Sequence, residues 1–332
     1  VKLLPSPLER VFFSESGSVA VEIAMKMAIQ FWLNRGIKGK HRLISFHGGY
    51  HGDTLGAMSI CDPEEGMHSL FQGALLSQHV VPLPKNEDEL KVFEQFIEEH
   101  VTECAAVIIE PLIQGVGGML MHSPECLQGI SEICSNHELL LIFDEIFTGF
   151  GRSGQMFAME EAGVVPDIVT FSKALTGGTV ALSATIASPE VFNAFLSMDD
   201  GAALMHGPTY MANPLACSAA VASLELFEVE PRIAQVSQIE IWLTELLSEA
   251  RALPNVKDVR VKGAVGVVEL AGNLPIDWLR RRFIDKGVWI RPFGNIIYLT
   301  PAFSINKADL CHLVESIIQV IEEMNSRGDA RV

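Results

Sequence analysis

The stretch "ELLLIFDEIFTGFGRSG", residues 138–154, joins an apolar run to two acids and a glycine-rich turn. Residues 139–143 have the length and composition of a strand that is buried on both faces. A carboxylate directly after such a strand, here Asp144, is costly to bury without a partner. The rest of the chain therefore has to supply a cation or a cofactor atom beside Asp144.

Two further apolar runs have the same character, "AAVIIEP" (105–111) and "DIVTFSK" (167–173). A helical pattern, "PECLQGISEICSNH" (124–137), lies between the first of them and the Asp144 run. Strands alternating with helices predict an α/β fold with a mostly parallel sheet, in which functional residues gather at the carboxyl ends of the strands. Glu110, Asp144 and Lys173 occupy such ends.

The organisation of the chain follows from similar patterns. Residues 16–36 predict a turn and a long helix that ends near Gly36. Helical stretches follow Pro214, and the alternation of short strands and helices after them indicates a smaller α/β domain. We expect a large domain over residues 1–220 and a small C-terminal domain over residues 221–332.

Composition narrows the class of function. The 332 residues are 48% hydrophobic and carry a formal net charge of −17, which argues against nucleic acid and acidic membranes as partners and favours small molecules. The six cysteines are scattered without metal-ligand spacing, so we expect reduced thiols, no disulfide framework and no metal. Without a membrane-length apolar stretch or a signal peptide, the sequence indicates a cytoplasmic protein.

Two motifs suggest the missing partner of Asp144. "SESGS" (14–18) places Ser18 at a helix N-terminus, which favours a phosphate, although an ordinary serine N-cap explains the same letters. "FSKALTGG" (171–178) places Lys173 after a buried strand, where a lysine can attack a carbonyl carbon, although a lysine reaching into solvent is the common alternative. Pyridoxal phosphate (PLP) would use all three groups, with Asp144 on its pyridine nitrogen.

Five motifs together carry a resemblance that none carries alone. In order and spacing, the chain resembles the class III (ω-type) aminotransferases of fold type I, which are aspartate aminotransferase-like. The motifs are "HGGYHGDTLGAMS" (47–59), "IIEPLIQGVGGM" (108–119), "IFDEIFTGFGRSG" (142–154), "FSKALTGG" (171–178) and "HGPTYMANPLAC" (206–217). It is improbable that all five motifs occur together by chance.

Two stretches, "ESGSVAVE" (15–22) and "GVWIRPFGNIIYLTPAF" (287–303), resemble one branch of that class. This branch transfers an amino group from S-adenosyl-L-methionine to 8-amino-7-oxononanoate in biotin biosynthesis. The resemblance implies the same substrates and a ping-pong mechanism. The alternatives are a related class III enzyme that uses lysine or another ω-amine as donor, and a catalytically impaired piece of the enzyme. Members of the family have a further N-terminal portion, which we expect to be missing here.

The resemblance also implies roles for individual residues. Lys173 and Asp144 would be catalytic, with Lys173 linked to the cofactor and Asp144 on the ring nitrogen. Gly17 and Ser18 would bind the phosphate. Pro208 and Thr209 would reach it from the neighbouring subunit of a homodimer.

Tyr50 would stack on the cofactor ring and would also be catalytic. It would line the substrate pocket together with Asp53, Gly207, Arg291 and Tyr298. Each has a simpler alternative, since Tyr50 can be core filler, Asp53 a helix cap and Arg291 a solvated charge. The polar residues Glu110, Gln114, His47, His51 and His206 are interpreted as structural or supporting groups.

Overall fold

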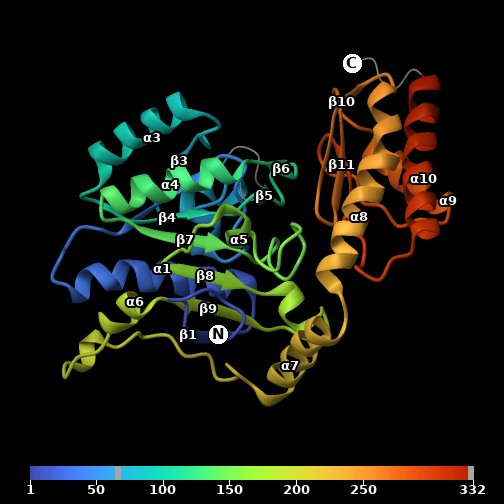
Figure 1. Ribbon diagram of the computed structural model, residues 1–332. Coiled ribbons are helices and arrows are strands. Elements are labelled where there is room, and N and C mark those ends of the chain that lie inside the picture. Colours follow the sequence, from blue (N-terminus) through green and yellow to red (C-terminus); the bar gives the residue numbers. More distant parts are fainter. Residues whose placement is uncertain (64–68, 328–332) are drawn as a thin grey trace. The chain divides into compact units, whose positions relative to one another are not determined.

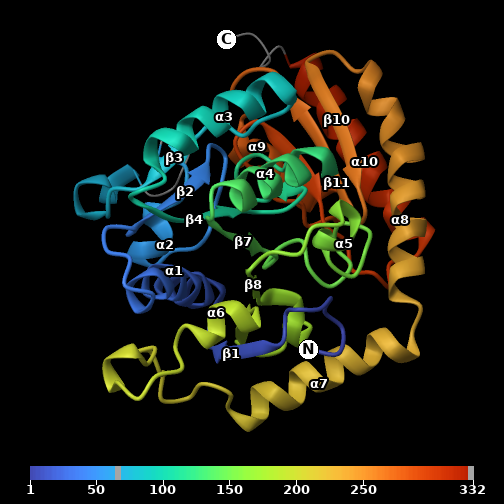
Figure 2. The same ribbon diagram turned by 60° about the vertical axis from the view of Figure 1, so that its left-hand side comes forward.

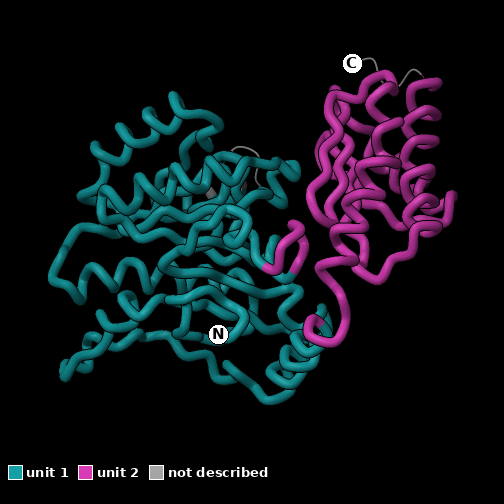
Figure 3. Tube along the Cα trace, in the orientation of Figure 1, with its two compact units in different colours: residues 1–150, 157–226 teal, residues 151–156, 227–332 magenta. Residues whose placement is uncertain are grey.

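The computed structural model describes residues 1–63 and 69–327 and divides the chain into two compact units. The first unit comprises residues 1–150 and 157–226, and the second comprises residues 151–156 and 227–332 (Figure 3). Each unit has its own sheet and its own helices (Figures 1 and 2).

The first unit is built on a seven-stranded sheet of order β1-β9-β8-β7-β4-β2-β3. The five strands from β8 to β3 run parallel, whereas β9 is antiparallel to both β8 and β1. The strands are β1 (Arg10–Ser14), β2 (Arg42–Phe46), β3 (His79–Val81), β4 (Cys104–Ile109), β7 (Leu140–Asp144), β8 (Ile168–Phe171) and β9 (Ser183–Ala187), with a separate two-stranded ribbon of β5 (Ile113–Gln114) and β6 (Leu120–Met121). This arrangement confirms the predicted α/β class and its mostly parallel sheet.

Helices cover both faces of this sheet. α1 packs across β4, β7, β8 and β9. Leu140 and Ile142 of β7 belong to the same buried apolar cluster as the side chains of α1. Leu141 and Phe143 of the same strand point to the other face and are equally buried, which explains the unbroken apolar run in the sequence. The helices are α1 (Gly17–Asn34), α2 (Leu55–Ser59), α3 (Glu87–His100), α4 (Pro124–Asn136), α5 (Ala158–Ala162), α6 (Pro189–Asn193) and α7 (Pro214–Val229), with short 3₁₀ turns η1 (Ser69–Ala74), η2 (Lys173–Thr176) and η3 (Asp200–Ala202).

The boundaries of α1 follow from its sequence. Ser16 is the N-cap, and its Oγ accepts a hydrogen bond from Val19 N. Gly36 follows the last turn with φ +80°, a conformation that glycine adopts without strain. The predicted helix is therefore confirmed at both ends, and the serine-cap interpretation holds for Ser16.

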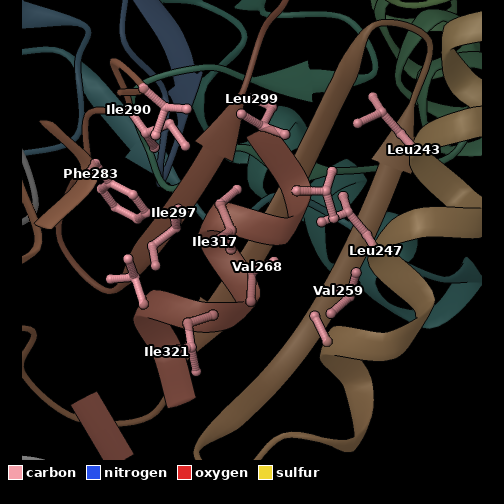
Figure 4. Packing of buried hydrophobic residues seen from close by; sticks show 14 of the residues in the cluster. Leu243, Leu247, Val259, Val268, Phe283, Ile290, Ile297, Leu299, Ile317 and Ile321 are labelled. Carbon is pink, nitrogen blue, oxygen red and sulfur yellow. The ribbon is translucent and has the colours of Figure 1, made fainter. Parts of the chain in front are cut away.

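The second unit is an antiparallel sheet covered by helices. Its strands are β10 (Val256–Lys262), β11 (Val265–Leu270) and β12 (Ile296–Leu299), in that order. Its helices are α8 (Arg232–Leu247), α9 (Ile276–Asp285) and α10 (Lys307–Ser326), with the 3₁₀ turn η4 (Ser248–Ala252). Leu243 and Leu247 of α8 and Ile317 and Ile321 of α10 pack on the strands in one apolar cluster (Figure 4).

The glycine-rich turn of the opening stretch belongs to this second unit through Arg152. The Arg152 guanidinium donates hydrogen bonds to the carbonyl oxygens of Ala264 and Pro301, at 3.0 and 2.9 Å, and lies 4.6 Å from the centre of the Phe303 ring. Burial lowers the pKa of Arg152 to about 10, so it remains charged at neutral pH. The turn is thus fixed to the loops beside β11 and β12.

Shortening one buried and one exposed side chain of α8 to alanine should separate the contribution of core packing from that of helix propensity. We expect Leu243→Ala, at a fully buried position, to lower the free energy of unfolding of the second unit by about 2–5 kcal/mol. The matched control Ile241→Ala, on the same helix but 53% exposed, should change it by less than about 1 kcal/mol. Chemical denaturation measures both, and equal losses would contradict the assigned core.

Candidate active site

Asp144, the last residue of β7, is buried and has three hydrogen-bond partners. Its Oδ2 lies 2.8 Å from His51 Nδ1, and its Oδ1 accepts from Thr170 Oγ1 at 3.2 Å and from Ile146 N at 3.1 Å. Thr170 stands opposite Asp144 in the parallel pair β7–β8. The buried carboxylate of Asp144 therefore has a hydrogen-bond donor within the protein, the imidazole of His51.

His51 is itself buried, and two effects on its pKa oppose each other. Burial alone would lower the pKa of the imidazole, but the hydrogen bond to Asp144 and the negative charges of Asp144 and Glu110 together raise it. The carboxylate of Asp144 thus favours the protonated form of the His51 ring over the neutral form. The distance of 2.8 Å between Asp144 Oδ2 and His51 Nδ1 is the close contact that a buried pair needs to offset the cost of removing it from water.

Glu110, just after β4, is the second carboxyl group of this cluster. Its Oε2 accepts from Tyr50 N and its Oε1 accepts from Gly115 N, both at 2.9 Å. Burial, opposed by His51, raises the pKa of Glu110 to about 7. Glu110 therefore fixes the backbone of the loop that carries Tyr50 and His51.

The two acids of the opening stretch have separate roles. The side chain of Glu145 accepts from the backbone N–H groups of Ala158 and Met159, at 2.8 and 2.9 Å. These groups begin α5, where a carboxylate satisfies unpaired donors. Burial raises the pKa of Glu145 to about 7. The carboxylate of Glu145 is thus engaged by the start of α5.

The loop between β2 and α2 connects this cluster to the start of α1. Tyr50 Oη donates to Asp53 Oδ1 at 2.8 Å, and Asp53 N donates to Ser18 Oγ at 2.9 Å. Burial and the hydrogen bond to Asp53 raise the pKa of Tyr50, so the phenol is neutral. Tyr50 is half-buried with a specific partner, and the cap of α2 is Thr54 rather than Asp53.

Glycines allow this loop to approach α1 closely. A side chain on Gly52, which has φ +133°, would lie 2.7 Å from Ser18 Cα. A side chain on Gly17 would lie 3.0 Å from Ile146 Cδ1, two residues after Asp144. These contacts bring the start of α1, the Tyr50 loop and the end of β7 together at one edge of the sheet.

The start of α1 has the donor groups that a phosphate needs. Ser16 Oγ takes Val19 N, but within the described parts of the chain no protein acceptor faces Gly17 N or Ser18 N. Free N–H groups at the start of an 18-residue helix favour an anion. Gly17 and Ser18 therefore have the donors that the phosphate of PLP would need.

Lys173 follows β8 and is exposed, with its Nζ 5.3 Å from the centre of the Phe147 ring. Over residues 1–63 and 69–327, its ammonium group has no hydrogen bond and no ion pair. Its φ of +42° lies in the left-handed region, which is strained for a residue with a side chain and is common at functional sites. Lys173 thus fits the position of the residue that binds the cofactor aldehyde.

Five further predicted site residues belong to other segments of the chain. Gly207, Pro208 and Thr209 are in the segment between η3 and α7, which Lys26 of α1 holds through Met205 O at 2.7 Å. The remaining two, Arg291 and Tyr298, belong to the second unit. Arg291 is exposed between α9 and β12, and Tyr298 is a half-buried residue of β12 opposite Val267. Their roles at the site remain predictions.

His51 and Glu110 are the residues whose contribution the sequence analysis did not identify. Both were interpreted as supporting groups, yet they supply the charge partner of Asp144 and the anchor of the Tyr50 loop. The "HGGYHGD" motif was the available signal, because it places two histidines beside a tyrosine and an acid in one glycine-rich loop.

Comparison with known proteins defines the class. Residues 1–321 match the family Aminotransferase class-III. The chain belongs to this family, and it is a PLP-dependent transaminase. The donor set described above, with its free lysine, buried carboxylate and helix N-terminus, fits that cofactor.

The chain is similar to several individual members of this family. The chain is 46% identical to the adenosylmethionine-8-amino-7-oxononanoate aminotransferase of Mycobacterium leprae, with 96% of this chain and 74% of that protein covered. The crystal structure of the enzyme of that name from Methanocaldococcus jannaschii superposes with a TM-score of 0.90 at 35% identity, covering 97% and 77% of the two chains. A PLP-bound amine transaminase from an uncultivated Pseudomonas species has a TM-score of 0.88 at 31% identity, covering 95% and 77%.

Substitution of Gly52 tests the close approach of the loop to α1. We expect Gly52→Ala to weaken PLP binding at least tenfold, because the new methyl group displaces the loop from Ser18. Gly73→Ala, at a position with open space and no positive φ, is the control and should bind PLP normally. Fluorescence titration with PLP measures both, and normal affinity in Gly52→Ala would contradict the assigned phosphate site.

Proposed function

We propose that this transaminase transfers an amino group from S-adenosyl-L-methionine to 8-amino-7-oxononanoate, giving 7,8-diaminononanoate in biotin biosynthesis. The observation that carries the proposal is the 46% identity over nearly the whole chain to a relative named for this reaction. Relatives from Corynebacterium glutamicum, at 43% identity, and Geobacter sulfurreducens, at 37%, carry the same name. The branch-specific stretches at residues 15–22 and 287–303 support the same assignment.

The surroundings of the residues support the roles that we propose for them. When bound, PLP supplies an electron-accepting ring that lets a proton leave the carbon bearing the transferred amine. Asp144 would keep the ring nitrogen protonated, and His51 and Thr170 orient its carboxylate for that task. Lys173 would move the proton, since none of the described residues holds its amine in a hydrogen bond or an ion pair.

The remaining residues would bind and orient. Gly17 and Ser18 would hold the phosphate, and Tyr50 would stack on the ring, positioned by Glu110 and Asp53. The larger domain, predicted over residues 1–220, would bind the cofactor, and the smaller one is predicted over residues 221–332. The compact units differ from these bounds, because the first extends to residue 226 and residues 151–156 belong to the second. The smaller domain would bring Arg291, whose planar guanidinium suits a substrate carboxylate, and Tyr298. Asp53 and Gly207 would complete the substrate pocket.

A homodimer would complete the site. α7 is strongly apolar, yet only Ala216 and Ala220 of its residues are buried. Leu215 is 81% exposed, and Tyr210 in the preceding segment is 79% exposed. An exposed apolar surface of this kind fits burial against a second subunit. Pro208 and Thr209, in the same segment, would then reach the phosphate bound by the partner.

The cellular setting is proposed on two observations. All six cysteines are free thiols, as in a reducing compartment. Among the helices in the described ranges, none has both the length and the apolar character needed to cross a bilayer. We place the enzyme in the cytoplasm with small molecules as its partners.

Loss of the lysine tests the site assignment. Lys173→Ala should abolish the visible absorption band of lysine-bound PLP and leave no cofactor attached after borohydride reduction and peptide mass mapping. Lys91→Ala, on the exposed face of α3, is the control and should retain both signals. A cofactor-bearing peptide other than that of Lys173 would overturn the assignment.

The amino donor tests the proposed reaction. The PLP form of the enzyme, mixed with S-adenosyl-L-methionine and no ketone, should convert to the pyridoxamine form, which the absorption spectrum reports. Lysine at the same concentration should convert it at least tenfold more slowly. Faster conversion by lysine or another ω-amine would instead place the chain with the class III enzymes that use those donors.

A further inference from the structure

Two histidines and a glutamate form a cluster at the edge of the first unit, at the end of the sheet order away from β8 and β9. His79 lies on the edge strand β3, His100 is the last residue of α3, and Glu103 lies just before β4. Glu103 Oε1 is 3.0 Å from His79 Nε2 and 2.9 Å from His100 Nδ1. One carboxylate oxygen thus faces two imidazole nitrogens from different elements.

We propose that His79, His100 and Glu103 form a binding site for one divalent transition-metal ion, with zinc as the reference ion. Their three ligand atoms all lie within 4.8 Å of one another. In a tetrahedral zinc site with bonds of about 2.0–2.1 Å, ligand atoms are separated by about 3.4 Å. The two separations from Glu103 Oε1, 3.0 and 2.9 Å, would each lengthen by about half an ångström to reach this value.

The cluster is held in place by its surroundings. The carbonyl oxygen of Glu103 accepts from His41 N and Arg42 N, and Glu103 N donates to His100 O. The His79 and His100 rings lie 4.6 Å apart, and the Phe96 ring is 4.4 Å from the ring of His100. Ligands fixed in this way need little reordering when an ion binds.

Charge and exposure are compatible with an ion that exchanges with solvent. Arg42 Nε is 3.4 Å from Glu103 Oε2, so the cation holds one oxygen and leaves Oε1 for the metal. α3, which ends at His100, carries six acidic residues and one lysine, and their field favours cations. The side chains of His79, His100 and Glu103 are 14%, 31% and 32% exposed, so an ion can reach them.

The ligand set indicates the class of ion. Two imidazoles and one carboxylate suit zinc, cobalt or nickel better than magnesium or calcium, which prefer oxygen ligands. Metal binding requires a lone pair on each ligating nitrogen, so the proton that each now donates to Glu103 moves to the other ring nitrogen or to solvent. The three ligands leave a fourth position for water. The site joins α3 to the edge strand and is separate from the proposed chemistry.

Calorimetric titration of the untagged, chelator-treated holoenzyme with zinc tests the site. The wild-type protein should bind one equivalent, and His79→Gln and His100→Gln should each raise the Kd at least tenfold. The control is His137→Gln, because His137 faces Glu94 at 3.4 Å without a second histidine, and its Kd should be unchanged. Absence of stoichiometric binding, or equal Kd values in all variants, would overturn the proposal.

A second measurement keeps the test independent of variant folding. The wild-type holoenzyme loaded with cobalt should show the visible bands of a nitrogen- and oxygen-ligated ion, without thiolate charge transfer in the near ultraviolet. A thiolate band would assign the ion to Cys217 or Cys311, the two half-exposed cysteines, and contradict the proposal. The visible band of the cofactor should be the same before and after metal removal.

Discussion

The buried hydrogen bond between Asp144 and His51 is the constraint around which the first unit is arranged. Asp144 ends a strand that is buried on both faces, so its charge has no access to solvent. His51 supplies the countercharge from a loop 93 residues earlier in the chain. Removing one partner of such a pair leaves an uncompensated buried charge, at a cost of about 3–5 kcal/mol. The fold must therefore hold this loop against the end of β7.

Several local features serve that requirement. Glu110 fixes the loop through Tyr50 N, and the conformation of Gly52 lets the loop approach Ser18 at the start of α1. The parallel pairing of β7 with β8 places Lys173 three residues beyond the partner of Asp144. A carboxylate, a free lysine and an open helix N-terminus consequently share one edge of the sheet. This combination suits a phosphorylated aldehyde with a ring nitrogen, and the family match agrees with it.

Much of this arrangement could be predicted from the sequence. Apolar runs ending in Glu110, Asp144 and Lys173 predicted the parallel sheet and the edge at which these residues gather. The motifs predicted the family and the cofactor, because each combines residue type with spacing. Capping by Ser16 and the glycine stop at Gly36 were equally readable, since both depend on local backbone geometry.

Other features depend on contacts between distant segments, which periodicity does not encode. The glycine-rich motif around His51 marks the loop, but it does not show that this histidine is the partner of Asp144. The attachment of residues 151–156 to the second unit depends on Arg152 meeting Ala264 and Pro301. The cluster of His79, His100 and Glu103 joins an edge strand to a helix end, so its ligands lack the short spacing of a metal motif. Absence of a metal was the expectation from spacing alone, and it stays a prediction for the zinc titration to decide.

The pH at which His51 loses its proton shows whether it is the charge partner of Asp144. Histidine-selective ¹⁵N NMR of the cofactor-free enzyme, with the signal assigned through His51→Gln, follows the ring as pH rises. We expect His51 to lose its proton above the ordinary imidazole value of about 6.5, because Asp144 and Glu110 outweigh burial. In Asp144→Asn the titration should fall below the wild-type value. A wild-type ring that is already neutral well below pH 6.5 would show that burial dominates and that Asp144 lacks the charge partner assigned to it.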